Sequence, residues 1–407
     1  MNRIIHIEEP RGRRRDREEG FSIFSYGFRP FFLAAGIYAI LPLIPWALYL
    51  SGVFEPTISL QAWHAHEMLF GFIAAGASGF LLTAIPNWTG APPMIGTRLK
   101  GLFLCWLAGR FVFWLYLFVD HSVLNYLLFI DLLLPILHGT HITRILMGTK
   151  QKRNYIFIGI MTMFVIANSL FILEFNNLTS NTAQVGGLFI ANIVMVMIAI
   201  VGGRVTPNFT RSWLRTQNIE ENIRSFPWIE KMAIGSLVVN ATLELFIPDS
   251  SPVYAVALFA AVVHLIRFSQ WNSLKTLYNP ALWVLHLGYF WLIASLFLKA
   301  FEGWLNLPYH LYLHAFTVGA VGSYMLGIMS RAALGHTGRA LSVSPPITTA
   351  YLLILAATLI RIATPFYPEY FVEGMVSTIA LWSAAFALYV WVYAPILTSP
   401  RVDGKPG

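Results

Sequence analysis

Apolar segments of roughly 20 residues recur along this chain from Phe31 to Ile396, and short polar loops separate them. A helix of that length is long enough to cross the hydrocarbon core of a bilayer. Charged residues make up only 11% of the chain, whereas soluble domains contain about 25%. The chain therefore lacks the polar surface of a water-soluble fold, and the pattern predicts an all-α, polytopic membrane protein.

The spacing of the apolar segments predicts about twelve transmembrane helices. Their approximate limits are residues 30–50, 66–86, 98–119, 122–147, 155–175, 183–203, 227–247, 252–270, 280–301, 310–332, 346–364 and 375–396. We expect a basic N-terminal tail at residues 1–29, a helical domain at 30–396 and a C-terminal tail at 397–407. No soluble domain fits between the segments, because the longest predicted loop runs only from Arg204 to Phe226.

Lys and Arg residues gather in alternate loops. The predicted outer loops around residues 51–61, 175–182, 248–252 and 302–309 contain none, whereas the predicted inner loops all contain some. Since cytoplasmic loops carry the excess of Lys and Arg, both termini are expected in the cytoplasm. The net charge of +8 then reflects orientation in the bilayer, which is the expected partner, and we expect no nucleic acid. The single cysteine, Cys105, excludes an internal disulfide and a Cys-based metal cluster.

The histidines are predicted to lie in two layers. The outer layer contains His64 and His66 with Glu67 on the second span, and His310 and His314 on the tenth. The members of the inner layer are His138, His141, His264, His286 and His336. Ionisable groups are costly in hydrocarbon and usually serve ligation, proton movement or substrate contact. The stretch from Trp63 to Gly71 is therefore the expected centre of the chemistry.

The spacing within the outer layer predicts which side chains can act together. His64 and His66 point about 200° apart on a regular helix, whereas His64 and Glu67 share a face. His66 would then serve one centre and His64 with Glu67 another. Imidazole suits iron, copper and zinc. The alternative is a set of interfacial histidines that bind loop carbonyls and no metal.

Two further spacing patterns occur within the spans. Asp131, His138 and His141 fall on one face of the fourth span, as a proton relay or a polar network that ties helices together would require. His66 precedes Gly71 and Gly79 by the same intervals at which His314 precedes Gly319 and Gly327, a weak internal echo that places both histidines at similar depth. Either an internal duplication or coincidence would produce it.

Glycine and arginine are combined in two predicted inner loops, residues 202–211 and 331–339. Glycines let backbone N–H groups approach an anion, and Arg binds carboxylates through two parallel hydrogen bonds. Arg204, Arg331 and Arg339 would thus suit haem propionates or an anionic substrate. Alternatively, these arginines only anchor the cytoplasmic face.

Several motifs together resemble the NnrS family of membrane proteins, over nearly the whole chain from Phe28 onwards. They are Trp63-His-Ala-His-Glu-Met68, Gly79-Phe-Leu-Leu-Thr83, Asn87-Trp-Thr-Gly90, Gly202-Gly-Arg204, Leu285-His-Leu-Gly-Tyr289, His314 with Gly319, and Gly335-His-Thr-Gly-Arg339. The resemblance implies a bacterial inner-membrane protein of the nitric oxide response that carries haem and copper. It singles out the positions His64, His66, His286, His314 and His336.

From this resemblance we expect one or more haem b groups and copper, with nitric oxide or a related nitrogen species as the ligand. His66 and His314 would be axial or copper ligands near the outer face, with His64 and Glu67 completing that site or carrying protons. His286 with His336 would form an inner site, and Arg204, Arg331 and Arg339 would meet propionates.

The expected activity inclines toward an oxidoreductase that takes electrons from quinol or a redox protein. The alternatives are a histidine-lined transporter of a metal ion or nitrogen species, and a non-catalytic haem sensor or metal donor. The spans at 183–203 and 227–247 contain no histidine, which argues against a conventional haem–copper oxidase subunit.

Overall fold

The structure is a computed structural model that describes residues 22–119, 124–308 and 311–405, and these ranges contain helices and turns but no β-strand. The α-helices are α1 (Phe28–Tyr38), α2 (Ile44–Leu50), α3 (Leu60–His66), α4 (Ala74–Thr89), α5 (Gly96–Phe118), α6 (Leu133–Thr149), α7 (Ile156–Phe175), α8 (Thr182–Thr216), α9 (Pro227–Phe246), α10 (Ser251–Ser269), α11 (Pro280–Leu305), α12 (Leu311–His314), α13 (Gly322–His336), α14 (Pro345–Ala363) and α15 (Phe371–Thr398). The predicted all-α architecture is confirmed. His310 and most of the N-terminal tail lie outside the described residues.

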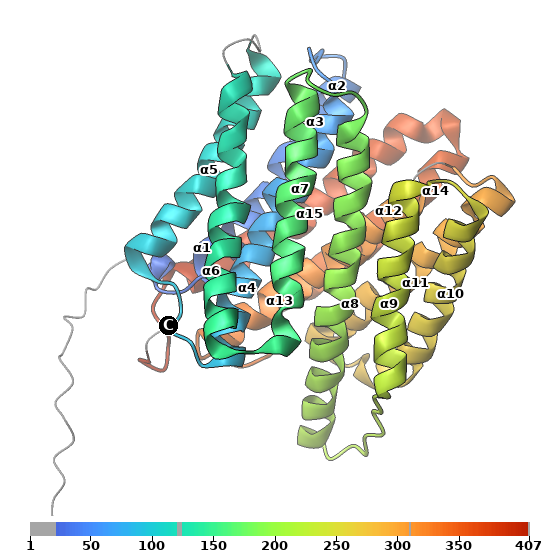
Figure 1. The fold of residues 1–407 in the computed structure, drawn as a ribbon. Helices are drawn as coiled ribbons and strands as arrows, with labels where there is room; N and C mark the ends of the chain where they lie inside the picture. The colour runs from blue at the N-terminus through green and yellow to red at the C-terminus, as the bar shows by residue number, and fades with distance from the viewer. Residues whose placement is uncertain (1–21, 120–123, 309–310, 406–407) are drawn as a thin grey trace, which may run out of the picture.

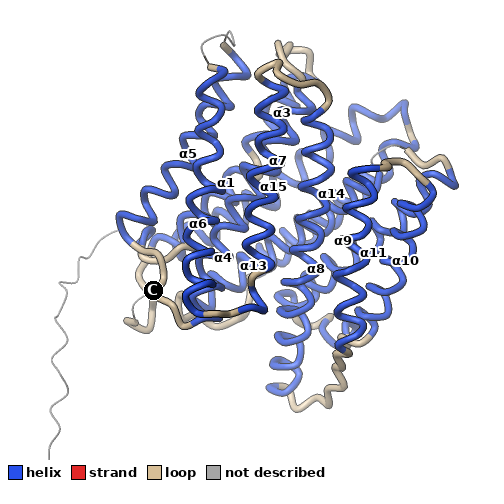
Figure 2. The backbone as a smooth tube through the Cα atoms, in the orientation of Figure 1, coloured by secondary structure: helices blue, strands red, loops and turns tan. Residues whose placement is uncertain are grey.

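The helices run side by side in alternating directions and form one bundle (Figures 1 and 2). Within the described chain, eleven helical stretches are long and apolar enough to cross a membrane. Of the twelve predicted spans, the one at 227–247 is not among these eleven. It forms the 20-residue helix α9, in which every 18-residue stretch contains the three charged residues Glu230, Lys231 and Glu244. The chain is therefore a multi-pass membrane protein.

The prediction that the two glycine–arginine stretches form loops is wrong, because both stretches are largely helical. Residues 202–211 lie inside the 35-residue helix α8, which is about 52 Å long and exceeds the roughly 30 Å hydrocarbon core. Residues 331–336 form the end of α13, and only the last three residues of that stretch lie beyond it. Backbone N–H groups inside a helix bind its own carbonyls, so they cannot surround an anion as a loop would.

Two π-helical segments interrupt the helices that carry the outer histidines. One, η3, spans Glu67–Ile73 directly after His66, and the other, η7, spans Ala315–Val321 directly after His314. The offset between His66 and His314 also separates these two segments. Single π turns are rare and occur mostly at functional sites. Their occurrence at equivalent positions after the two histidines therefore adds to the similarity between the two sequence stretches.

The helices around the two π segments repeat as well. In the first half, η3 packs against α1 and α5; in the second, η7 packs against α11 and α14. The same offset carries Phe113 onto Arg361. Phe113 stacks on His66 with ring centroids 3.6 Å apart, while Arg361 hydrogen-bonds to His314 at 3.0 Å. The two halves thus hold a histidine in equivalent frames but give it different neighbours.

One end of the bundle, which we call the basic end, is where α5, α9 and α14 begin and α6, α8, α10, α13 and α15 finish (Figure 1). Here Arg29 is fully buried, and its Nη1 donates to the carbonyls of Leu397 at 2.9 Å and Ser399 at 2.7 Å. These groups belong to the last turn of α15, whose carbonyls have no partner within the helix. Arg29 therefore fastens the C-terminal helix to α1.

Replacing Arg29 by methionine should leave these buried carbonyls without a donor. Each unsatisfied buried group costs about 1–3 kcal/mol, so the melting temperature of the detergent-purified protein should fall by several degrees. Arg215→Met is the matched control, because Arg215 is exposed and pairs only with Glu221 at the surface. Equal melting temperatures for the two variants would show that Arg29 does not cap α15.

Candidate functional site

A cluster of ionised and polar side chains is buried among the helices of the first half, and we call it the His66 cluster. Its members are Tyr38 on α1, His66 at the end of α3, Glu67 at the start of η3, Arg110 on α5, Asp131 on the 3-10 helix η4 (Asn125–Leu132) and Asn168 on α7. Each of the four ionisable groups other than Tyr38 is at most 2% exposed. Such a group of charges requires internal compensation, because burying a single unpaired charge is prohibitively costly.

Arg110 lies between the two carboxylates. Its Nη1 donates to Glu67 Oε1 at 2.5 Å, and its Nη2 donates to Asp131 Oδ1. One planar guanidinium thus joins α5 to η3 and η4 at once. Arg110 would otherwise be an unpaired cation within an apolar helix, so the two carboxylates account for its presence there.

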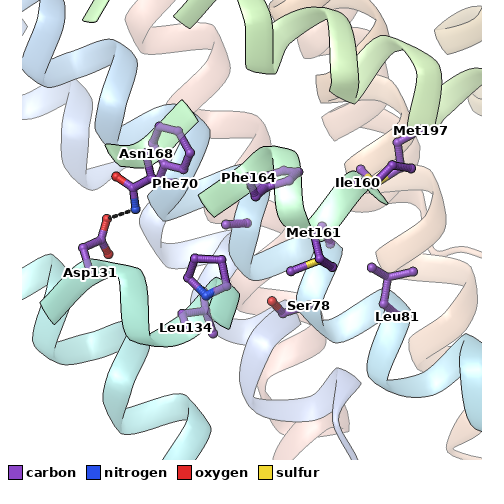
Figure 3. A pocket seen from close by; sticks show the side chains of 13 residues that line it. Phe70, Ser78, Leu81, Asp131, Leu134, Ile160, Met161, Phe164, Asn168 and Met197 are labelled. Atoms are coloured by element: carbon purple, nitrogen blue, oxygen red, sulfur yellow. Dashed lines mark hydrogen bonds between the residues drawn. The ribbon is translucent and has the colours of Figure 1, made fainter. Parts of the chain in front are cut away.

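His66 uses both ring nitrogens in the cluster. Its Nδ1 lies 2.8 Å from Glu67 Oε1, and its Nε2 lies 2.9 Å from Asn168 Oδ1 and 3.2 Å from Asp131 Oδ2. The Asn168 amide is oriented by its other end, since Nδ2 donates to Asp131 Oδ2 at 2.9 Å (Figure 3). All the neighbours of the ring are therefore acceptors, and only the imidazolium form donates from both nitrogens.

The protonated imidazole balances the charge of the cluster. His66 and Arg110 contribute two positive charges, and Glu67 and Asp131 contribute two negative ones. Removal of the His66 proton would leave an uncompensated negative charge in the bundle. The cluster is thus a buried, charge-balanced site in which the imidazole of His66 is protonated.

The π segment and two glycines allow the cluster to assemble. A Cβ atom on Gly71 would lie 2.3 Å from the Tyr38 ring, and one on Gly109 would lie 3.1 Å from the Asp131 backbone. Tyr38 donates its hydroxyl proton to Glu67 Oε2 and accepts from Trp114 Nε1 at 2.8 Å. The second carboxylate oxygen of Glu67 is therefore also bound.

A small cavity of about 10 Å³ lies on the basic-end side of the His66 cluster. Asp131, Asn168 and Ser78 contribute its polar lining, as Figure 3 shows. This volume corresponds to about one water molecule. Beyond the cavity, Ser78 Oγ lies 3.2 Å from Nδ1 of the buried His138, whose Nε2 has no hydrogen-bond partner among the described atoms.

Asp131 and His138, which were predicted to lie on one face of the fourth span, contact different groups. Seven helical residues span about 10 Å along the axis, so Asp131 reaches the His66 cluster while His138 reaches Ser78. The predicted association of His64 with Glu67 is wrong. Glu67 turns toward His66 and Arg110, whereas His64 packs edge-on against Trp46 with ring centroids 6.0 Å apart.

His64 and His314 are neighbours of the same cation. Arg361 Nη2 lies 3.0 Å from His314 Nε2 and is close enough to His64 to act on it electrostatically. The outer histidines are thus divided between an acidic environment at His66 and a basic one at Arg361. In this arrangement the Nε2 lone pair of His314 accepts from Arg361, and a metal at that atom would require Arg361 to move.

The inner histidines occupy separate surroundings. His286 is 4% exposed, and its Nε2 lies 2.9 Å from Thr210 Oγ1 while Nδ1 has no partner among the described atoms. His336 instead lies beside the rings of Tyr26 and Phe28 at the basic end. The expected inner site of His286 with His336 is not assembled by these contacts.

The three arginines assigned to propionates also lie apart. Arg204 donates to Asn154 Oδ1 at 3.0 Å, Arg331 lies 4.0 Å from the ring centroid of Phe209, and Arg339 lies near Arg29. Within the described chain, no group of three or more His, Cys, Asp or Glu side chains is arranged to hold a metal ion. Buried ring nitrogens without a hydrogen-bond partner are present at His64 Nδ1, His138 Nε2 and His286 Nδ1.

Sequence reasoning missed Arg110, Tyr38 and Asn168, which complete the His66 cluster. It also missed a second buried ion pair, between Lys299 on α11 and Glu244 on α9, which Asn192 and Tyr312 join through hydrogen bonds to Glu244. A signal existed for both. Arg110 and Lys299 each lie within an apolar span, where a cation requires a carboxylate partner.

Replacing Arg110 by methionine should leave Glu67, Asp131 and His66 with one excess negative charge. Removing one partner of a buried pair costs about 3–5 kcal/mol, so the folded fraction in size-exclusion chromatography after graded heating should drop sharply. Adding Glu67→Gln restores the charge balance and should recover part of that stability. A double variant no more stable than Arg110→Met would contradict the charge-balance interpretation.

Comparison with known proteins assigns the chain to a family. A profile of the family described as NnrS protein matches residues 22–401. No curated protein matches the sequence of the chain. Because the match covers nearly the whole chain, including every residue of the His66 cluster, the protein belongs to the NnrS family.

Proposed function

We propose that this protein relieves nitric oxide stress in the bacterial inner membrane by converting nitric oxide at a histidine-bound haem or copper centre, with protons supplied through the His66 cluster. Membership of the NnrS family supports a role in the nitric oxide response. The observation that carries the proposal further is the buried imidazolium held between two carboxylates.

A protonated imidazole buried in the bundle favours conversion of nitric oxide over simple binding of nitric oxide. The reduction 2 NO + 2 H⁺ + 2 e⁻ → N₂O + H₂O consumes protons, and a buried site must receive them through fixed groups. Quinol or a redox protein would supply the electrons. A sensor that binds nitric oxide without turnover requires neither, so in that alternative the cluster would serve only to hold the helices together.

The chain fits a centre held by one imidazole better than a centre held by several side chains. His286 has a buried Nδ1 without a partner, and Thr210 fixes the ring through Nε2. Ligating histidines are commonly oriented in this way by a hydrogen bond at the second nitrogen. We therefore assign His286 as the first candidate ligand and His64 as the second. A bound haem iron or copper would supply an open coordination position for nitric oxide and carry electrons.

His66 takes the role of proton donor rather than ligand. Both its nitrogens are hydrogen-bonded to acceptors, which leaves no lone pair for a metal. Toward the basic end, a water in the small cavity would join Asp131 to Ser78, and Ser78 contacts His138. This line of groups would reload His66 from the cytoplasm.

The ligand assignment predicts that His286→Ala lowers the haem content of the purified protein, read as the Soret absorbance per protein together with metal analysis. His66→Gln should retain haem and lose nitric oxide consumption by the reduced protein, since it removes a proton donor and not a ligand. His141→Ala, at a half-buried position near the basic end, is the control. A folded wild-type protein without haem or copper would refute the proposal and favour a transport path.

The proton line predicts that Ser78→Ala slows nitric oxide consumption without changing the haem spectrum. Positioned proton-transfer groups contribute about 10²–10⁴-fold to a rate, and a loss of at least about tenfold is expected here. Thr140→Ala is the matched control, because Thr140 is exposed on α6 and binds only the Ile136 carbonyl. Equal rates for both variants, measured with a nitric oxide electrode, would remove Ser78 from the path.

A further inference from the structure

A cleft of about 610 Å³ opens at the basic end, among the first residues of α7, the extension of α8, the start of α9 and the connection between α8 and α9. Figure 1 shows α8 reaching beyond its neighbours at this end, with the loop to α9 running back from its tip. The volume lies within the usual range of small-molecule sites, about 300–1,000 Å³. This cleft is separate from the His66 cluster and shares no residue with it.

The lining of the cleft is strongly basic. Its cationic members are Arg153, Arg204, Arg211, Arg224, Lys231 and Arg267, and Glu230 is the one carboxylate among the lining residues. Arg267 binds Glu230 through Nε at 3.1 Å and through Nη2. The one negative charge is therefore already paired.

Four of the cations lack a carboxylate. Among the described residues, ion pairs reach Arg211 and Arg267 but not Arg153, Arg204, Arg224 or Lys231. Arg204 contacts the neutral amide of Asn154 and lies 5.8 Å from the ring centroid of Trp88. Because Arg153, Arg204 and Lys231 come from different segments and line a common space, their mutual repulsion favours an anion between them.

The remaining wall of the cleft is apolar. It includes Ile156, Ile200, Ile234 and the largely buried Trp271. A ligand that satisfies both walls carries an anionic group on an apolar or weakly polar body. Guanidinium groups bind phosphate oxygens through paired hydrogen bonds, and a lysine ammonium serves as a point charge for phosphate.

We propose that this cleft binds the phosphate group of an organic phosphate ester, with Arg153, Arg204 and Lys231 around the phosphate and the Ile200–Trp271 wall against the remainder of the ligand. The same chemistry is offered by the headgroup of an anionic phospholipid and by a soluble phosphate ester. The site lies at the basic end, which the distribution of Lys and Arg predicts to face the cytoplasm and the headgroups there.

The test measures the melting temperature of the full-length protein against added ligand. One arm uses phosphatidylcholine nanodiscs with and without phosphatidylglycerol, and the other uses detergent-solubilised protein with glycerol 3-phosphate. A rise in the first arm alone identifies a lipid headgroup, and a rise in the second identifies a soluble ester. No rise in either arm would overturn the proposal.

Charge-matched variants separate the cleft from general attraction to the basic end. Arg153→Gln with Lys231→Gln removes two exposed cations of the cleft, and Arg98→Gln with Lys100→Gln removes two exposed cations at the start of α5. The cleft variant should bind at least tenfold more weakly, while the control keeps wild-type affinity. Equal weakening in both would mean that the cations act only as a general surface charge and would overturn the proposal.

Arg204→Gln tests the most buried of the three proposed phosphate-binding cations and separates this site from the haem proposal. It should abolish the ligand-induced rise in melting temperature and leave the Soret absorbance per protein unchanged. Loss of haem from Arg204→Gln would instead assign the arginine to a cofactor carboxylate, and the phosphate proposal would fall while the proposed nitric oxide function would stand.

Discussion

The ion pairs of Arg110 with Glu67 and Asp131 determine how the first half of the bundle is assembled. Between helices in a bilayer there is little hydrophobic driving force, so packing and polar contacts decide which helix faces meet. An uncompensated charge at this depth would be costly, and α5, η3 and η4 must therefore keep a register that brings the three groups together. The π segment after His66 and the close approaches at Gly71 and Gly109 serve this register.

The two halves of the bundle hold equivalent histidines in similar helical surroundings, but the charges beside these histidines are opposite in sign. In the first, an imidazole lies between carboxylates and keeps its proton; in the second, the equivalent imidazole of His314 accepts from a guanidinium. The ring nitrogen of His314 that faces Arg361 therefore acts as an acceptor, whereas both ring nitrogens of His66 face acceptors. The repeated architecture thus places two histidines in equivalent frames with opposite hydrogen-bonding surroundings.

The polar groups divide the bundle along its length. The His66 cluster lies away from the basic end, as do His64 and His314 beside Arg361. His138 lies toward the basic end, and the basic cleft opens there. His138, Ser78 and the small cavity lie in that order between the basic end and Asp131. The extension of α8, which was predicted as a loop, builds one wall of the cleft. A helix that continues beyond the bilayer holds its cations in fixed positions, whereas a loop would leave them mobile.

The sequence by itself determined the membrane class, the spans and the residues with ionisable side chains in hydrocarbon, because apolar length and charge placement are local properties. It also indicated the stretch from Trp63 to Gly71, since His66 and Glu67 stand out in an apolar segment. Which of these side chains pair with one another depended on the tertiary structure. The π turn after His66 separates Glu67 from His64, and the pairing of His66 with Asp131 and Asn168 depends on helices far away in the chain. Spacing along one helix cannot predict these contacts, because they are decided by which faces of different helices meet.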